Sequence, residues 1–459
     1  MEITRALTSF WLGTQQYNLT QLETYYYGQQ TARDGMLTTE QAGRPDITRF
    51  WRPVNYCATI IDEPVGYLAN GRVRITSEDE SLTAWANDYH NRRIRPRLDD
   101  LIRWQGLYGE SYLYLWTDYE GASRGLKADA VPPVENGKRR VAADYGGQDP
   151  EEITKAIIYK LAPVDTTGEM DEYRITIERE TITVEKRRLA TQTTTGYGAF
   201  TTVSSEPNPS GVLPIIPAFN PTPSDILDFL YIQDDLDKLH LDLRLSREYH
   251  GLPLLTTDAP DVGDLEIGAG RILFGGNFQR LDPPANTAML EEAERLLTSG
   301  AMITRSLALA NQSGANISGI ALRFLQQNFE SRLLAKAQRI ETALEQALWT
   351  AARLIGSDQR LVDAEVREYE VGRPTPEQLR RAEFAVTLEP NIPADEKSNA
   401  EIAAIWLSQL GVSQETALGK AGVENPAGEV ERAMLEREAM MRPRPAMPGE
   451  LSEDDDADR

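Results

Sequence analysis

One run of helical periodicity dominates this sequence. Between Ile320 and Ile355, apolar residues recur at spacings of three and four, which is the pattern of one buried helix face. The residues in this run are Leu322, Leu325, Phe329, Leu333, Ala337, Ile340, Leu344, Ala347, Ala351 and Leu354. At 1.5 Å per residue, a helix of this length spans roughly 50 Å, which is longer than an average domain. We therefore expect one long helix that acts as a spine for the other elements.

Two shorter helical segments precede this run, with a glycine-rich insertion between them. The first is expected to begin at Ser224 or Asp225 and to continue to Tyr249. Its apolar residues lie on more than one side, so it needs neighbours on more than one side. The second is expected over residues 288–309, and the insertion over residues 252–284 suggests short strands and turns. The two helices can then lie side by side.

The first half of the chain predicts an α+β region with an antiparallel sheet. Residues 1–110 are typical of helices, and strands follow Gly109. The expected strands are 111–116 and 156–161, with a hairpin of 173–177 and 181–184. Six prolines in residues 191–223 are expected to fragment any regular element there.

The carboxyl-terminal part predicts one strand followed by short helices. The strand is expected at residues 384–388, and the helices at 395–410, 413–421 and 426–440. The final residues, 442–459, are rich in proline and then in acid, which is typical of a disordered tail.

The charge balance excludes a protein that grips nucleic acid along a basic face. Acidic residues outnumber basic ones by 71 to 48, which gives a formal charge of -23. Tight nucleic-acid binding depends on Lys and Arg neutralising phosphates, and docking on anionic membranes needs the same charge. No apolar window approaches the length of a membrane-spanning helix. The single cysteine, Cys57, cannot form an intrachain disulfide and is interpreted as a buried thiol.

Residues that would form an enzyme site are hard to find. The three histidines are not at zinc-binding spacings, and there is no phosphate-binding loop or nucleophile elbow. The sequence therefore predicts no catalytic residues, no cofactor and no metal. An acidic cluster on the first of the paired helices is interpreted as a solvated face, and two basic clusters as salt-bridged surface. The acids are Asp234, Asp235, Asp237 and Asp242; the basic residues are Arg92, Arg93, Arg95, Arg97, Lys138, Arg139 and Arg140.

The order of these elements resembles that of the portal proteins of tailed double-stranded DNA bacteriophages. Five local segments, in the same order, resemble the portal subfamily common among phages of actinobacteria, and the likeness covers roughly residues 20–440. They are YYYGQQ (25–30), RPVNYCATIID (52–62), LYGESYLYLWTDYEG (107–121), NISGIALRFLQQNFESRLLAKAQ (316–338) and LGVSQETALGKAGVENPAGEVERAMLE (410–436).

The resemblance implies a portal fold with an α/β wing, a helical stem, a small α/β clip and an α-helical crown. The implied parts are the wing (1–221), a stem helix (222–250), the clip (251–286), a second stem helix (287–308), a tunnel loop (309–317), the long helix and rest of the wing (318–390), the crown (391–441) and the disordered tail (442–459).

The resemblance also implies a function without catalysis. Portal proteins assemble as a ring, usually a dodecamer, at one capsid vertex of the virion, after assembly in the host cytoplasm. The ring contacts the major capsid protein, receives the terminase large subunit and later the head–tail adaptor, and conducts double-stranded DNA during packaging and ejection. No membrane is involved. An acidic channel wall would repel the duplex toward the axis.

Two groups of residues are the expected channel lining. The tunnel loop would use Asn311, Gln312, Ser313, Gly314, Ala315 and Asn316. Its polar side chains, those of Asn311, Gln312, Ser313 and Asn316, offer hydrogen bonds without strong charge. The stem would use the acids Asp234, Asp235 and Asp242. The alternatives are another virion ring or head-completion adaptor, and a cytosolic enzyme with an unrecognised site.

Overall fold

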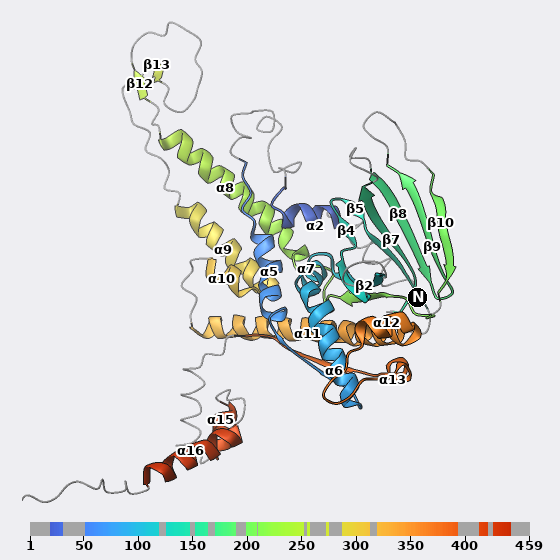
Figure 1. Ribbon diagram of the computed structural model, residues 1–459. Helices are drawn as coiled ribbons and strands as arrows, with labels where there is room; N and C mark the ends of the chain where they lie inside the picture. Colours follow the sequence, from blue (N-terminus) through green and yellow to red (C-terminus); the bar gives the residue numbers. More distant parts are fainter. Residues whose placement is uncertain are drawn as a thin grey trace, which may run out of the picture. The chain divides into compact units, whose positions relative to one another are not determined.

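The chain divides into two units, Met1–Asn391 and Ile392–Arg459. The computed structural model describes residues 19–30, 51–118, 125–146, 152–163, 170–189, 199–208, 210–251, 255–257, 272–274, 287–312, 319–392, 413–420 and 426–441. The first unit combines helices with sheets that are antiparallel except for one short pair, which confirms the α+β class (Figure 1).

Helices of the first unit include the long helix predicted from the periodicity. The described helices are α2 (Leu19–Tyr26), α5 (Tyr56–Leu68), α6 (Glu80–Tyr89), the π-helical turn η1 (His90–Ile94), the 3-10 turn η2 (Arg95–Arg97), α7 (Leu98–Tyr108), the 3-10 turn η3 (Leu227–Phe229), α8 (Leu230–Gly251), α9 (Thr287–Thr304), α10 (Leu307–Gln312), α11 (Gly319–Ser357), α12 (Gln359–Glu365) and α13 (Pro376–Arg381). The prediction of one long helix is confirmed by α11. Its apolar face, including Phe329 and Ile340, is buried.

The described strands form two larger sheets and three small pairs. Their bounds are β1 (Arg72–Thr76), β2 (Glu110–Asp118), β3 (Gly125–Val131), β4 (Val134–Glu135), β5 (Lys138–Arg139), β6 (Val141–Tyr145), β7 (Ile153–Pro163), β8 (Met170–Glu178), β9 (Thr181–Arg188), β10 (Thr201–Pro207), β11 (Ile215–Phe219), β12 (Leu255–Thr257), β13 (Ile272–Phe274) and β14 (Ala385–Glu389). The orders are β10-β9-β8-β7-β6, β11-β2-β3, β1-β14, β4-β5 and β12-β13. The predicted strands and the β8–β9 hairpin are confirmed.

The sequence predicted helices over residues 1–110, but the structure shows that this region is not helical throughout. Strand β1 interrupts this region and pairs antiparallel with β14, which is more than 300 residues away along the chain. Helix α5 lies within the region predicted as helical, although its limits were not predicted. The Asn55 side chain caps it by accepting a hydrogen bond from the Ala58 amide (3.0 Å), which satisfies one of the unpaired donors at a helix start. Pairing partners this distant leave no local signal in the sequence.

The proline-rich segment is more regular than expected. Strands β10 and β11 both lie within it, although prolines were expected to fragment it. Pro217 lies inside β11, which is an edge strand of its sheet. An edge position tolerates proline because one side of the strand makes no ladder hydrogen bonds. The prediction that prolines prevent regular secondary structure in this segment was therefore wrong.

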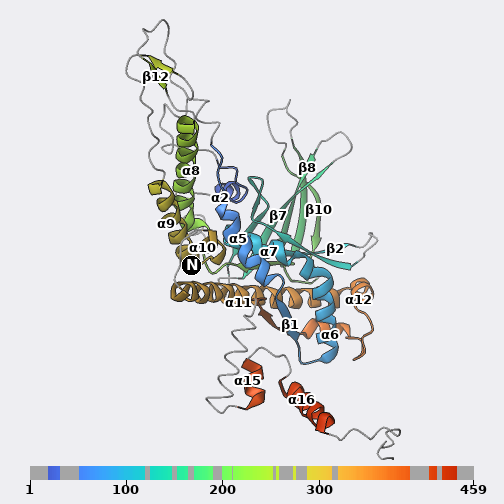
Figure 2. The ribbon, with the colours of Figure 1, turned by 90° about the vertical axis from the view of Figure 1, so that its left-hand side faces the viewer.

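The paired helices have different limits from those predicted. Helix α8 begins at Leu230 after the 3-10 turn η3, and not at Ser224 or Asp225. Helix α9 ends at Thr304, and a separate short helix, α10, covers part of the segment predicted as a loop. Helices α8 and α9 lie side by side, as Figures 1 and 2 show. Within the insertion between them, the described residues form the short parallel pair β12–β13.

Two hydrophobic cores can be traced among the described residues of the first unit. One gathers residues of α2, α5, α7, η3, α8, α9, α10 and α11, including Cys57, Phe229 and Leu309. The other lies between the five-stranded and three-stranded sheets and includes Tyr112, Ile158 and Ile215. The base of the paired helices therefore belongs to the same core as the long helix, and the outer sheet has a core of its own.

The second unit contains two described helices, α15 (Gln414–Lys420) and α16 (Pro426–Met441). They confirm two of the three short helices predicted here. The predicted helix at 395–410 and the tail at 442–459 lie outside the described residues. Among the helices that the structure describes in either unit, none is both long and apolar enough to span a membrane.

Candidate channel-lining helices and their buried anchor

The acids of α8 differ in exposure, although the sequence presents them as one cluster. Asp235 is exposed, while Asp234 and Asp242 are partly buried. The Tyr25 hydroxyl of α2 donates a hydrogen bond to the Asp234 carboxylate. Burial raises the pKa of Asp242, and the nearby Lys238 ammonium partly offsets that rise. Of the three acids expected to line a channel, Asp235 is thus the one that a single chain leaves exposed.

Asp237 belongs to the interior and has a structural role. Its carboxylate is 3% exposed and accepts hydrogen bonds from the Gln30 side chain and the Val54 amide, each at 3.0 Å. Burial raises the pKa of Asp237, and these hydrogen bonds lower it. The contacts attach the segment before α5 to α8. The interpretation of Asp237 as part of a solvated face was wrong, because its partners are distant in sequence.

The chain turns sharply between α9 and α10. Arg305 has a φ of 55°, in the left-handed region that non-glycine residues seldom adopt. The buried Ser306 hydroxyl then accepts a hydrogen bond from the Leu309 amide (3.1 Å), which caps α10.

The tunnel-loop residues are only partly described. Asn311 and Gln312 are exposed at the end of α10, so the first part of the expected loop is helical. Ser313, Gly314, Ala315 and Asn316 lie outside the described residues.

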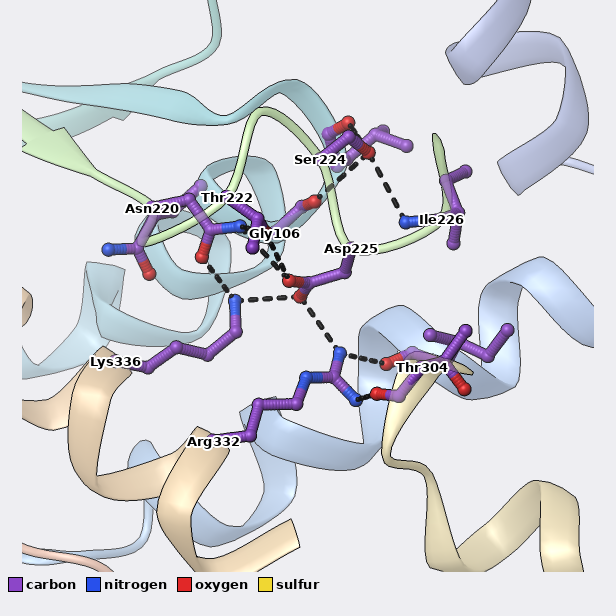
Figure 3. Close-up of polar contacts among 12 residues, drawn as sticks. Gly106, Asn220, Thr222, Ser224, Asp225, Ile226, Thr304, Arg332 and Lys336 are labelled. Atoms are coloured by element: carbon purple, nitrogen blue, oxygen red, sulfur yellow. Dashed lines mark hydrogen bonds and ion pairs between the residues drawn. The ribbon is translucent and has the colours of Figure 1, made fainter. Parts of the chain in front are cut away.

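A buried charge cluster lies between η3 and α11, which Figure 3 shows. The Asp225 carboxylate is 2.7 Å from the Lys336 ammonium and 3.0 Å from the Arg332 guanidinium. The side chains of Asp225 and Lys336 are 4% and 2% exposed. Asn220 completes the cluster, because its oxygen accepts from Lys336 (2.7 Å) and its nitrogen donates to Asp225 (3.0 Å). We call these four residues the Asp225 cluster.

The cluster contains two cations and one carboxylate. Although burial alone would raise the pKa of Asp225, the Arg332 and Lys336 charges lower it to about 2. Burial lowers the pKa of Lys336, and Asp225 opposes that change. Asp225 therefore remains charged and compensates two buried cations, so it anchors the residues before α8 to the long helix.

Sequence reasoning missed this cluster because it treated Asp225 as a helix start. A signal was nevertheless present. Arg332 and Lys336 are four residues apart and adjoin the apolar residues Leu333 and Ala337, which lie on the buried stripe of α11. Charged side chains next to a buried stripe require a partner of opposite charge.

Comparison with known families identifies the chain. The sequence profile described as "Phage portal protein, SPP1 Gp6-like" matches residues 14–442 of the 459. The chain belongs to the phage portal protein family. A search among curated proteins finds no significant match. The resemblance to phage portal proteins is thus confirmed, while the subfamily common among phages of actinobacteria stays a prediction. The portal family is structural and not enzymatic.

Several arginines of the portal protein's basic clusters form ion pairs with acids of the same unit. Arg92 and Arg93 bind the buried Glu365 carboxylate at 3.1 and 2.7 Å, and Arg97 binds Asp129 at 3.3 Å. Such pairing leaves these arginines less available to phosphate, in line with their interpretation as salt-bridged surface. Within the described ranges, no group of three or more His, Cys, Asp or Glu residues is arranged to hold a metal ion.

Several large apolar side chains of the paired helices and of α11 remain exposed in the single chain. Their exposed fractions are 54% for Tyr231, 53% for Leu290, 56% for Met302, 51% for Ile303 and 62% for Phe324. On α9, Met302 and Ile303 lie away from the face formed by the buried residues Leu297 and Ala301. These faces lack a covering element within the described part of the chain.

Proposed function

We propose that this portal protein assembles into a dodecameric ring at one capsid vertex and conducts double-stranded DNA through a central channel. The observation that carries the proposal is the exposed apolar surface of α8, α9 and the start of α11. Burying one such side chain contributes about 1.5–3 kcal/mol, so neighbouring copies would gain stability by covering it. The family assignment to phage portal proteins favours this arrangement over a head-completion adaptor or an enzyme.

The channel wall would be formed by α8 with its exposed acid Asp235, together with Asp234 and Asp242 where neighbouring chains leave them accessible. The tunnel loop, residues 309–317, would narrow the channel. A negative wall repels phosphate and keeps the duplex near the axis. Salt limits the range of this repulsion to a Debye length of about 10 Å from the wall. The chain's charge of -23 thus suits a conduit for DNA.

The proposed assembly has defined partners and a defined place. The wing, clip and crown assignments follow the boundaries given from the resemblance. The ring would contact the major capsid protein, receive the terminase large subunit during packaging and then bind the head–tail adaptor before ejection. Assembly would occur in the host cytoplasm, and the ring would remain at the portal vertex of the virion.

Electron microscopy of the purified full-length protein tests the ring. We expect rings with a central hole, and a monodisperse monomer of 51.3 kDa at high protein concentration would contradict the proposal. Met302→Asp should reduce ring formation, because a charge would enter the apolar contact. Glu294→Lys, also at an exposed position of α9, is the matched control and should leave rings intact.

Packaging of DNA tests the channel assignment separately. Deletion of residues 312–315 should leave rings intact and impair packaging. Asp235→Lys should slow DNA passage, because each lysine can bind phosphate and release counterions. Asp228→Lys, at an exposed position of the turn before α8, is the control. Unchanged packaging and unchanged salt dependence in Asp235→Lys would place that acid outside the channel.

A further inference from the structure

The short helix α10 cannot set its own position. It has six residues, which is fewer than an isolated helix needs to be stable in water. Its residues Leu309 and Ala310 are buried and Leu307 packs against the same core, while a hollow of about 540 Å³ lies between α10 and α5. The hollow is lined by residues that include Thr59, Tyr67 and Asn311. Apolar packing therefore attaches α10 to the core, and polar contacts at the α9–α10 turn connect it to α5 and α11.

Glu63 of α5 provides one of those contacts. Its carboxylate accepts a hydrogen bond from the Ala308 amide at 2.8 Å, in the first turn of α10. Burial raises the pKa of Glu63, and contacts with Ser306, Ala308 and the Arg332 charge lower it. A carboxylate at this end satisfies a free amide and interacts favourably with the helix dipole. Glu63 therefore attaches the start of α10 to α5.

Arg332 of α11 provides the second contact. Its guanidinium donates hydrogen bonds to the carbonyl of Thr304, the last residue of α9 (2.9 Å), and to the carbonyl of Ile60 in α5 (3.1 Å). The same group binds Asp225. One side chain thus joins α5, α9, α11 and the residues before α8. The strained residue Arg305 follows directly after Thr304, so the turn begins at a carbonyl that Arg332 holds.

We infer that Glu63 and Arg332 are positioning residues that orient α10, and with it Asn311 and Gln312. Glu63 binds the amide side of the α9–α10 turn, while Arg332 binds its carbonyl side. Together they set where the chain points at the end of α10. The inference rests on the proposed function only in the role given to Asn311 and Gln312 in a channel, because the contacts belong to a single chain.

Hydrogen exchange of the full-length protein, measured by mass spectrometry, tests the inference. In Glu63→Ala, we expect the amides of residues 309–312 to exchange about tenfold faster, because α10 then opens more often. Glu63→Gln retains an acceptor oxygen for the Ala308 amide and should restore most of the protection. Arg332→Met should have the same effect on residues 309–312. Arg339→Met, which removes an exposed arginine of α11, should leave these amides unchanged.

Two results would overturn the inference. Unchanged exchange at residues 309–312 in both Glu63→Ala and Arg332→Met would show that apolar packing alone positions α10. An equal rise at residues 343–355 of α11 would show a general loss of stability and no positioning role. Failure of the wild-type protein to form rings would contradict the proposed function, whereas the exchange comparison would still decide the roles of Glu63 and Arg332.

Discussion

Two buried carboxylates of the first unit each bind two cations, yet their surroundings differ. The Glu365 side chain is 0% exposed, but its partners Arg92 and Arg93 remain 24% and 17% exposed. Asp88 also binds Arg92, at 2.9 Å, so two acids face two bases. In the Asp225 cluster, Arg332 is 10% and Lys336 2% exposed, and one carboxylate faces both.

The difference in exposure determines how well the cations around Glu365 and those around Asp225 tolerate the loss of their carboxylate. Partly exposed arginines keep part of their hydration, so the loss of Glu365 should destabilise their charges less. Lys336 has no such access to water, and its charge depends on Asp225. The Asp225 cluster is therefore the more sensitive of the two, and it lies where α11 joins the paired helices.

The largest effect is expected for Asp225→Asn. The change removes the carboxylate that two buried cations share, which should lower the free energy of unfolding by about 3–5 kcal/mol. Urea unfolding of the full-length protein at fixed concentration measures the loss. As a control, Glu377→Gln breaks an exposed pair with Arg381 and should change the free energy by less than about 0.5 kcal/mol. A similar loss in both variants would contradict the role of burial.

Glu365→Gln should lower the free energy of unfolding by less, about 2 kcal/mol. The neutral side-chain oxygen can still accept a hydrogen bond from the Leu126 amide, and Arg92 keeps its ion pair with Asp88. The same urea experiment measures this loss. A loss as large as that of Asp225→Asn would mean that the partial exposure of Arg92 and Arg93 does not matter, and the comparison between the clusters would fail.

The lowered pKa of Asp225 predicts a dependence on acid pH. The folded value is about 2 and the ordinary value is 3.8, so the contribution is complete above about pH 4 and is lost as the pH falls through 2. It amounts to about 2 kcal/mol. The difference in unfolding free energy between wild type and Asp225→Asn should shrink by this amount from about pH 5 to about pH 2. A constant difference over that range would show that Asp225 has an ordinary pKa.

The smallest effect is expected at Gly106, which makes room for the Asp225 cluster. A Cβ atom there would lie 2.8 Å from the Asp225 carboxylate and 3.4 Å from the Lys336 ammonium. Gly106→Ala should displace that carboxylate and lower the free energy of unfolding by about 1 kcal/mol in total. This net value includes the gain in helix propensity that alanine brings. Gly66→Ala in α5 has no atom within 4 Å and should stabilise by up to about 1 kcal/mol, which thermal unfolding can measure. A gain in both variants would show that the carboxylate moves without cost.

Local pattern was a good guide where neighbours along the chain decide the structure. The helix α11, the β8–β9 hairpin and the strand β2 follow from apolar spacing and from β-forming residues. The start of α8 was predicted at Ser224 or Asp225, but the helix begins at Leu230. These two residues are of the types found at helix starts, yet their side chains bind other elements. The Ser224 hydroxyl donates to the Leu107 carbonyl at 2.7 Å, a contact across more than 100 residues.

The candidate site was predictable only as a set of residues. Asp234, Asp235 and Asp237 are equivalent in sequence, and only packing distinguishes an acid bound to Tyr25, an exposed acid and a buried acid bound to Gln30. The assignment of channel-lining roles to Asp234, Asp235 and Asp242, and to the loop residues 311–316, stays a prediction.

The sequence by itself determined the class of the fold, the order of its longest elements and the portal family, because periodicity and motif order are properties of neighbouring residues. Only the tertiary structure decided which charges are buried together. A carboxylate before α8 and two cations on α11 become one cluster when these two distant segments meet, and desolvation then makes each charge depend on the others. That dependence attaches the long helix of this portal protein to its paired helices.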